Sequence, residues 1–142
     1  MSSAMPPTST PFGQRVARRL RDESVIWLTT VSADGTPQPN PVWFLWDGTS
    51  LLIYSLATAA RLAHIARNAR VSLHFNSDDQ GDDIIVITGE AHVAPGEPSA
   101  EQMPEYLRKY SGAIAREFGT PASFAAQYSV PLRITPVKVR GY

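Results

Sequence analysis

Cysteine is absent from the 142 residues. The chain therefore has no disulfide framework, no thiol nucleophile and no thiolate metal site. A chain without cysteine suits a reducing compartment, and we expect a cytoplasmic protein.

The chain also has no net charge, because 13 basic residues balance 13 acidic ones. Proteins that bind nucleic acid usually carry a basic excess, so we expect no nucleic-acid partner.

Long apolar runs and local catalytic signatures are missing as well. No run approaches the roughly 20 residues of a membrane helix, and the first residues lack the features of a secretory signal, so we expect no membrane partner. The sequence has no G-x-S-x-G, G-x-G-x-x-G or G-x-x-x-x-G-K-[ST] motif, the local signatures of serine hydrolases, Rossmann folds and P-loops. The histidines His64, His74 and His92 have no metal-ligand spacing, so we expect no metal site.

Short β-branched and aromatic segments dominate the chain after its first ten residues. Residues 1–10 are rich in serine, threonine and proline, and we expect a disordered arm there, followed by a single domain over residues 11–142. Strands are expected over residues 25–31, 37–46, 50–55, 71–75, 84–93 and 130–140. Helices are expected from residue 11, over residues 59–68 and 99–109, and from residue 121. Six strands joined mostly by tight turns predict a mainly β fold, a small closed antiparallel barrel with flanking helices.

Local signals mark the ends of these elements. Hairpin turns are predicted at Asp34-Gly35 and Asp47-Gly48, and a bulge at Gly89. The residues placed to cap helices are Thr10, Thr58, Ser99 and Thr120.

Three alternate prolines, Pro37, Pro39 and Pro41, occupy one expected strand. Residues i, i+2 and i+4 direct their backbone groups to the same edge, so these prolines remove three N–H donors from one edge only. The strand can pair through its other edge, which keeps the donors of Gln38 and Asn40. The bare edge is either open to a ligand or partner chain, or is simply a rigid edge protected against aggregation.

A positive side chain, Arg61, falls in the first turn of the helix expected over residues 59–68. A cation there opposes the helix dipole unless something negative is bound, and free N–H groups at a helix start favour anions. His64 and Asn68 follow at i+3 and i+7 on the same polar face. The segment predicts either an anion site or a solvated face on which the arginine pairs with a carboxylate.

The stretch WLTTV-x-x-DGTPQPNPVWFLWDG, followed by IYS and a helix opening in Ala-Arg-Leu, resembles the pyridoxamine-phosphate-oxidase-like split barrels. More narrowly, it is similar to an actinobacterial group of enzymes that use the deazaflavin coenzyme F420. The resemblance runs from about Arg18 to the C-terminus and is loose over residues 95–128. It implies a six-stranded split β-barrel of the FMN-binding type and a homodimer with a cofactor in each of two grooves at the subunit interface.

The resemblance also implies which residues contact that cofactor. Contacts to the ring fall on the second strand, at Asn40, Pro41, Val42, Trp43 and Phe44. Contacts to the phosphate fall around the helix start, at Ser55, Thr58, Ala60 and Arg61. The position of Arg61 is usually lysine in this family, and arginine keeps the charge while adding a planar fork. Further cations, His64 and Arg67, are candidates for a long anionic tail, and Lys138 and Arg140 on the last strand are others.

The expected function is a reductase that takes a hydride from reduced F420 and passes it to an electron-poor small molecule such as a conjugated alkene or a quinone. Two alternatives remain open: an FMN-dependent oxidoreductase on the same fold, and a non-catalytic protein that binds a cofactor or tetrapyrrole. The two cofactors differ in the length of their tails, because FMN ends at its phosphate whereas F420 continues into a long anionic tail. Catalytic residues are not identifiable, although Tyr54, His64 and a bound water are all candidate proton donors.

Overall fold

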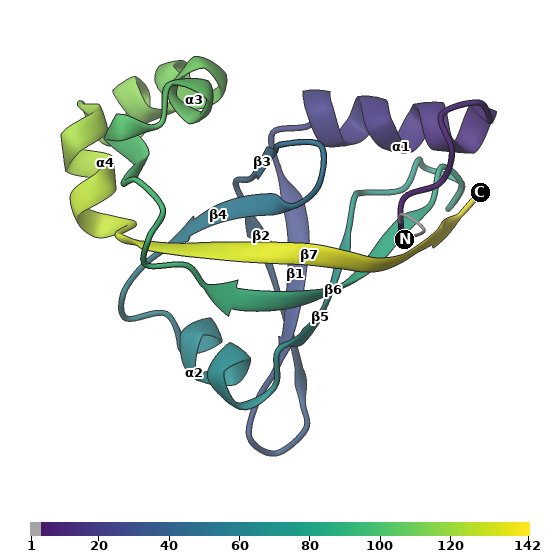
Figure 1. Ribbon diagram of the computed structural model, residues 1–142, viewed down its shortest axis with the longest axis horizontal. Helices are drawn as coiled ribbons and strands as arrows, with labels where there is room; N and C mark the ends of the chain where they lie inside the picture. Colours follow the sequence, from purple (N-terminus) through teal and green to yellow (C-terminus); the bar gives the residue numbers. More distant parts are fainter. Residues whose placement is uncertain (1–3) are drawn as a thin grey trace.

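Seven strands form one curled antiparallel sheet in the computed structural model, which describes residues 4–142 (Figure 1). The strands are β1 (Ile26–Val31), β2 (Pro37–Val42), β3 (Leu45–Trp46), β4 (Leu51–Ser55), β5 (Arg70–His74), β6 (Ile85–Val93) and β7 (Val130–Gly141). Their order across the sheet is β2-β1-β5-β6-β7-β4-β3. The mainly β, antiparallel prediction is confirmed.

The predicted count of six strands is wrong, because the strand expected over residues 37–46 is interrupted at Trp43 and Phe44. The backbone N–H of Phe44 donates to the Tyr110 hydroxyl at 2.8 Å. Its carbonyl accepts from Lys109 Nζ, also at 2.8 Å. Side chains of a later helix thus take the place of ladder partners, and the expected strand becomes β2 and β3.

The predicted closed barrel is also wrong. β2 and β3 are the two edges of the sheet and pair only with β1 and β4, respectively. Because only two residues join these edges in sequence, the sheet must curl until the edges meet at Trp43 and Phe44, and beyond that junction it stays open. The prolines of β2 explain the opening, since its outer edge carries no N–H donor from Pro37 to Pro41. The bare edge derived from the proline spacing is therefore confirmed.

Helices lie around the sheet at separate places (Figure 1). They are α1 (Pro11–Asp22), α2 (Ala60–Arg67), the 3₁₀ turn η1 (Ala100–Gln102), α3 (Pro104–Glu117) and α4 (Pro121–Gln127). Helices α3 and α4 lie together at one end of the sheet, α1 crosses another side, and α2 forms part of the connection between β4 and β5. No helix within residues 4–142 is long and apolar enough to cross a membrane.

The predicted caps hold at two helices and fail at two. The hydroxyls of Thr10 and Thr120 accept hydrogen bonds from the backbone N–H groups three residues later, at 3.0 and 3.1 Å. Helix α2 has Ala59 at its cap position and no side-chain cap, so the Thr58 prediction is wrong. Ser99 makes no cap hydrogen bond either. The helix expected over residues 99–109 is instead a short 3₁₀ turn, followed by α3, which begins at Pro104 and continues to Glu117.

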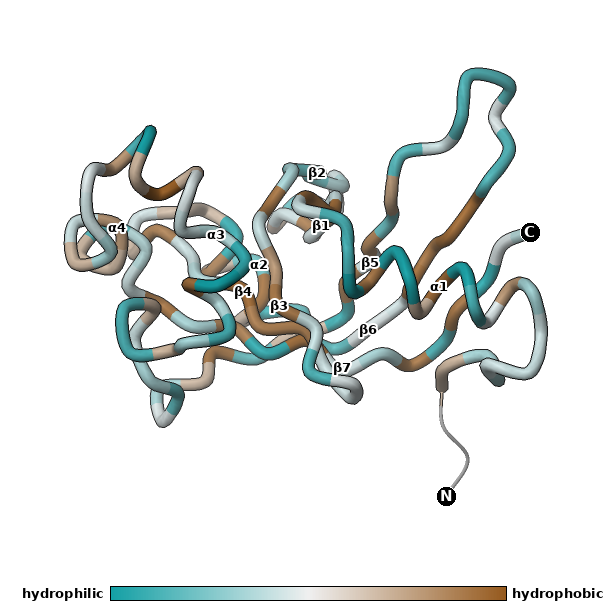
Figure 2. The backbone as a smooth tube through the Cα atoms, turned by 90° about the horizontal axis from the view of Figure 1, so that it is seen from above, coloured by the Kyte–Doolittle hydropathy of each residue, from teal (hydrophilic) through white to brown (hydrophobic). Residues whose placement is uncertain are grey.

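The predicted turns and bulge are confirmed. Gly35 and Gly48 have φ angles of +87° and +97°, which glycine adopts without strain. The register between β6 and β7 shifts between Thr88 and Gly89. The polar connection between β5 and β6 projects away from the rest of the chain (Figure 2). Of the expected arm, residues 1–3 lie outside the described residues, and Met5 packs against the core.

The core has two parts. The first fills the interior of the curled sheet and includes Leu28, Phe44 and Ile87, all fully buried. The second lies between the sheet and the helices α3 and α4, and includes Tyr106 and Phe124. Consecutive residues join the two parts, because Phe44 belongs to the first and Trp43 packs against the second. The functional cavity lies in the second part.

Candidate functional site

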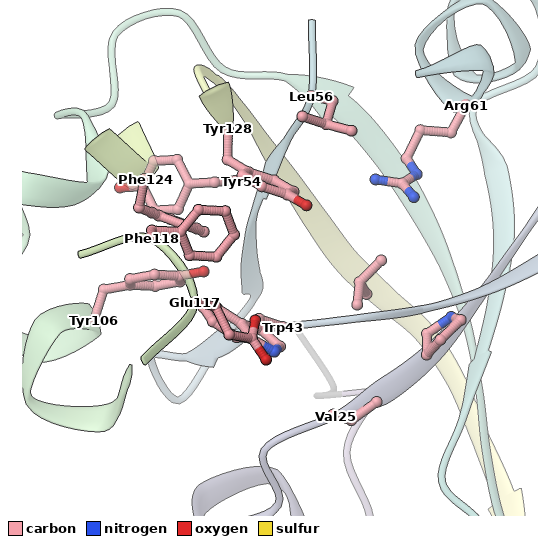
Figure 3. A pocket seen from close by; sticks show the side chains of 12 residues that line it. Val25, Trp43, Tyr54, Leu56, Arg61, Tyr106, Glu117, Phe118, Phe124 and Tyr128 are labelled. Carbon is pink, nitrogen blue, oxygen red and sulfur yellow. The ribbon is translucent and has the colours of Figure 1, made fainter. Parts of the chain in front are cut away.

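A cavity of about 300 Å³ lies between the end of β2, the start of α2 and the pair α3 and α4 (Figure 3). Its lining residues come from six separate parts of the chain and are Val25, Pro41, Val42, Trp43, Tyr54, Leu56, Arg61, Tyr106, Glu117, Phe118, Phe124 and Tyr128. Aromatic side chains cover one end, and Arg61 lies at the other. The cavity is therefore largely apolar, and its lining includes one cation, Arg61, and one carboxylate, Glu117.

The aromatic end is held by ring contacts around Trp43. Its indole stacks on Tyr110, with ring centroids 4.6 Å apart and planes 5° from parallel. It also stacks on Phe124 at 5.5 Å. Phe118 meets Trp43 edge to face at 6.3 Å. Offset and edge-to-face contacts of this kind hold aromatic rings in defined orientations. These walls suit a planar ligand.

The cationic end is formed by Arg61 at the start of α2. Its Nη1 donates to the Ser55 hydroxyl at 3.3 Å, and Ser55 is fully buried. The guanidinium is half-buried, and burial lowers the pKa of Arg61 from its usual value. Within residues 4–142, Arg61 takes part in no ion pair. A partly desolvated cation without a carboxylate partner is well placed to bind an anion.

The cavity brings together four of the residues expected to contact a cofactor, namely Pro41, Val42, Trp43 and Arg61. Two others lie in supporting positions. Ser55 holds the Arg61 guanidinium, and Phe44 is buried in the core beside the cavity. Asn40 lies exposed on β2, opposite Leu28 of β1. The pattern of prolines and the helix start, which are separate signals in the sequence, thus meet at one place.

The remaining expected residues do not line the cavity. Thr58 and Ala60 are exposed at the start of α2. His64 Nδ1 lies 2.9 Å from the Thr30 hydroxyl, and Arg67 donates to the Val31 carbonyl at 3.1 Å, so both contact β1. The last-strand candidates are Lys138 and Arg140, which are exposed opposite β6. Arg67 and Arg70 are exposed, at the end of α2 and the start of β5. Ligand contacts by these residues stay predictions.

Sequence reasoning missed the wall that α3 and α4 contribute. Tyr106 and Tyr110 are spaced by four residues, as are Phe124 and Tyr128, so each pair lies on one face of its helix. That spacing shows that each helix has an aromatic face. It does not show that both faces meet the end of β2, because this depends on how the helices dock onto the sheet.

The tyrosine hydroxyls of this region differ in their partners. Tyr54 donates to the Pro98 carbonyl at 2.8 Å, and burial raises its pKa to about 12. Tyr110 donates to the Ser24 carbonyl at 2.7 Å and accepts the Phe44 N–H. Tyr106 has no hydrogen-bond partner within the described residues. Of the candidate proton donors, Tyr54 therefore has its proton committed to the backbone.

The sequence matches the family model for pyridoxamine 5'-phosphate oxidase over residues 12–142. The chain belongs to this family. The match covers the sheet and all the helices, including the residues that line the cavity. No curated protein matches the chain.

Solved structures of other members and relatives of the fold agree with this family assignment. A candidate pyridoxamine 5'-phosphate oxidase from Listeria innocua is 23% identical, with a TM-score of 0.65 over 89% of this chain and 94% of that one. A protein described as an F420 reductase is also 23% identical, with a TM-score of 0.66 over 87% and 94%. The heme storage protein HutZ from Vibrio cholerae is 12% identical, with a TM-score of 0.63 over 93% and 95%. Identities this low establish the common fold and nothing finer.

The family fold thus places an apolar, aromatic cavity beside an unpaired edge and a free cation. The cavity can hold a planar ring, and the cation can hold an anionic group attached to it. Such an arrangement can bind and orient a reactive cofactor.

Proposed function

We propose that the chain is an oxidoreductase that binds the deazaflavin coenzyme F420 and reduces an electron-poor small molecule, a conjugated alkene or a quinone. One observation carries the proposal: Arg61 lies half-buried and free of carboxylates at the end of an aromatic cavity that also contains Pro41, Val42 and Trp43. Family membership supports it, because the matching family is one of oxidases.

The residues present fit a tricyclic cofactor that carries a phosphate. Arg61 can form two parallel hydrogen bonds with phosphate oxygens, and its partial burial strengthens that interaction. The outer edge of β2 offers carbonyl acceptors from Pro37, Pro39 and Pro41 and no N–H donors, so it suits the N–H of a pyrimidine ring. The aromatic side chains around Trp43 close the far end of the cavity and so keep water away from a ring held beside Pro41 and Val42. When bound, the cofactor supplies the hydride, and the chain supplies position and a dry environment.

The choice of F420 over FMN rests on two cations that follow Arg61 in the chain. Arg67 and Arg70 are both exposed, at the end of α2 and the start of β5. FMN ends at its phosphate and has no group for these cations to bind, whereas F420 continues into an anionic tail. FMN remains the alternative cofactor, and a non-catalytic tetrapyrrole carrier remains the alternative function.

Fluorescence titration of the purified protein with F420 and, separately, with FMN tests the proposal. We expect F420 to bind more tightly than FMN and Arg61→Glu to weaken F420 binding at least about tenfold, the loss of one charge-assisted hydrogen bond. Arg18→Glu is the matched control, because Arg18 is exposed on α1 and does not line the cavity. Unchanged F420 affinity in Arg61→Glu contradicts the phosphate assignment.

The same titration separates the alternatives. Preference for FMN would make the chain an FMN-dependent oxidoreductase. Binding of neither cofactor, with binding of a porphyrin such as hemin, would make it a carrier.

The variant Arg67→Gln tests the contact to the anionic tail of F420. We expect it to weaken F420 binding and to leave FMN binding unchanged, because FMN has no such tail.

A further inference from the structure

The hydroxyl of Tyr106 is buried in the wall of the cavity without a hydrogen-bond partner. Tyr106 is fully buried, and its oxygen has no donor or acceptor within hydrogen-bond distance among the described residues. Burying a hydroxyl in this way costs about 1–3 kcal/mol. Buried polar groups are therefore almost always paired in folded proteins, and an unpaired one needs an explanation.

Neighbouring tyrosines show that the region can pair hydroxyls. Tyr54 and Tyr110 pack directly against the Tyr106 ring, with centroids 4.9 and 4.8 Å away. Each has its hydroxyl bonded to a backbone carbonyl. The Tyr106 oxygen instead points from α3 toward the middle of the lining residues (Figure 3). Its orientation directs the one unpaired hydroxyl of this cluster at the cavity.

The surroundings of Tyr106 define what could pair with it. Phe118, Phe124 and Trp43 form the adjoining walls, which favour a planar, apolar ligand. Glu117 is the one carboxylate among the lining residues, and it disfavours an anion at this end of the cavity. Arg61, which would favour an anion, lies at the opposite end. The ligand at Tyr106 is therefore a neutral ring with a hydrogen-bond acceptor, and the anionic ligand belongs at the other end.

We propose that the aromatic end of the cavity is the binding site of the electron acceptor and that the Tyr106 hydroxyl donates a hydrogen bond to its carbonyl oxygen. The acceptor is then a neutral, planar, conjugated carbonyl compound of the quinone class. This inference rests on the proposed function, since it assigns the two ends of one cavity to the two reactants.

The role of Tyr106 is to hold and polarise the carbonyl. Burial raises the pKa of Tyr106 far above its ordinary value, so the hydroxyl keeps its proton at neutral pH. It can therefore stabilise negative charge that develops on a carbonyl oxygen, as donors aimed at a developing oxyanion do.

Two probes of the same shape test the proposal: menadione, a naphthoquinone, and 2-methylnaphthalene, which has the same rings and no carbonyl. Binding of each is measured by calorimetry in the cofactor-free protein and in the protein saturated with F420. The chain has no cysteine, so menadione cannot add to a thiol. We expect Tyr106→Phe to weaken menadione binding about tenfold and to leave 2-methylnaphthalene binding unchanged, because one hydrogen bond is lost. Tyr142→Phe is the matched control, a hydroxyl removed from an exposed residue outside the cavity.

Three results overturn the proposal. The first is that Tyr106→Phe and the unsubstituted chain bind menadione with equal affinity. The second is that Tyr106→Phe weakens the binding of menadione and of 2-methylnaphthalene equally. The third is that the unsubstituted chain does not bind menadione, with or without F420. The affinity for F420 is followed in parallel and should not change in Tyr106→Phe. If the unsubstituted chain does not bind F420, the proposed function fails. The effect of Tyr106→Phe on menadione binding can still be measured in the cofactor-free protein, so the two failures are distinguishable.

Discussion

Two tyrosines on successive turns of α3 have hydroxyls in opposite situations. The Tyr110 oxygen accepts the Phe44 N–H, donates to the Ser24 carbonyl and lies 2.9 Å from the Phe44 carbonyl. The Tyr106 oxygen has no partner within residues 4–142. The same substitution at the two positions therefore separates a hydroxyl that stabilises the fold from one that does not.

Tyr110→Phe should lower the free energy of unfolding by about 1–3 kcal/mol, because it leaves the buried Phe44 N–H unpaired. Tyr106→Phe should be neutral or stabilising, since it removes a hydroxyl that is buried without a partner. Urea unfolding of both variants and the unsubstituted chain, followed by circular dichroism, measures the difference. Equal losses at the two positions would contradict this account.

Lys109 adds a pH dependence to the same junction. Its Nζ lies 2.8 Å from the Phe44 carbonyl and 3.7 Å from the Phe44 ring centroid, and burial lowers its pKa to about 8. The unfolded chain, with an ordinary lysine pKa near 10.5, binds more protons between these two values. Stability then rises with pH across that window.

We expect the contribution of Lys109 to the free energy of unfolding to increase from about pH 8 to about pH 10.5. The measurement is urea unfolding of the unsubstituted chain and of Lys109→Met across this window. Contributions of all other groups are common to both proteins and cancel in the difference. Two pH profiles that stay parallel would show that Lys109 keeps its ordinary pKa.

At the scale of elements, the bulge between β6 and β7 depends on a side chain being absent. A Cβ on Gly89 would lie 2.9 Å from Ile134 Cγ2 and 3.0 Å from the Thr135 carbonyl oxygen. Both distances are shorter than ordinary van der Waals contacts, and the carbonyl belongs to the backbone of the paired strand. The two strands can keep this register only with glycine at the bulge.

Gly89→Ala should therefore destabilise the fold by about 1–3 kcal/mol, the usual cost of an overpacked site. Gly96→Ala is the control, because a Cβ there meets nothing within 4 Å. Its stability should stay within a few tenths of a kcal/mol of the unsubstituted chain or rise slightly. Thermal unfolding of the two variants checks both expectations, and a tolerated Gly89→Ala would mean that β7 shifts easily.

Elements that depend on local chemistry could be predicted from the sequence. The turns at Gly35 and Gly48, the bulge at Gly89 and the bare edge of β2 each follow from the residues at the position itself. The interruption at Phe44 could not be predicted, because its hydrogen-bond partners lie more than sixty residues away, on α3. The closed barrel, predicted from six strands joined mostly by tight turns, is wrong because β2 and β3 remain as the two edges of the sheet.

The same distinction between local signals and long-range packing applies to the candidate site. Arg61 and the residues around Pro41 could be found in the sequence, because a cation in a first helical turn and a proline in a strand are unusual locally. The wall formed by Tyr106 and Phe124 could not, because it exists only once α3 and α4 dock against Trp43. Local signals identify residues with a special role, whereas packing decides what completes a cavity.

For the whole molecule, the junction at Trp43 and Phe44 connects stability with function. The two sheet edges meet there, and α3 is attached there through Lys109 and Tyr110. The cavity lies directly beside it, with the sheet as one wall and α3 and α4 as another. Loosening α3 would therefore open the aromatic end of the cavity while leaving Arg61 in place.

The open sheet also leaves apolar surface that a second copy could cover. Val137 in the C-terminal half of β7 and Tyr142 just after it are exposed, at 56% and 67% of their full areas. We propose that the protein is a homodimer with the cofactor at the subunit interface, as the family resemblance implies. Light scattering on the purified protein at micromolar concentration should give twice the 15.5 kDa of the chain. Because binding at an interface stabilises the assembly, F420 should also strengthen the dimer on dilution. A mass of one chain at every concentration, with and without F420, would contradict the dimer and place the whole site within a single subunit.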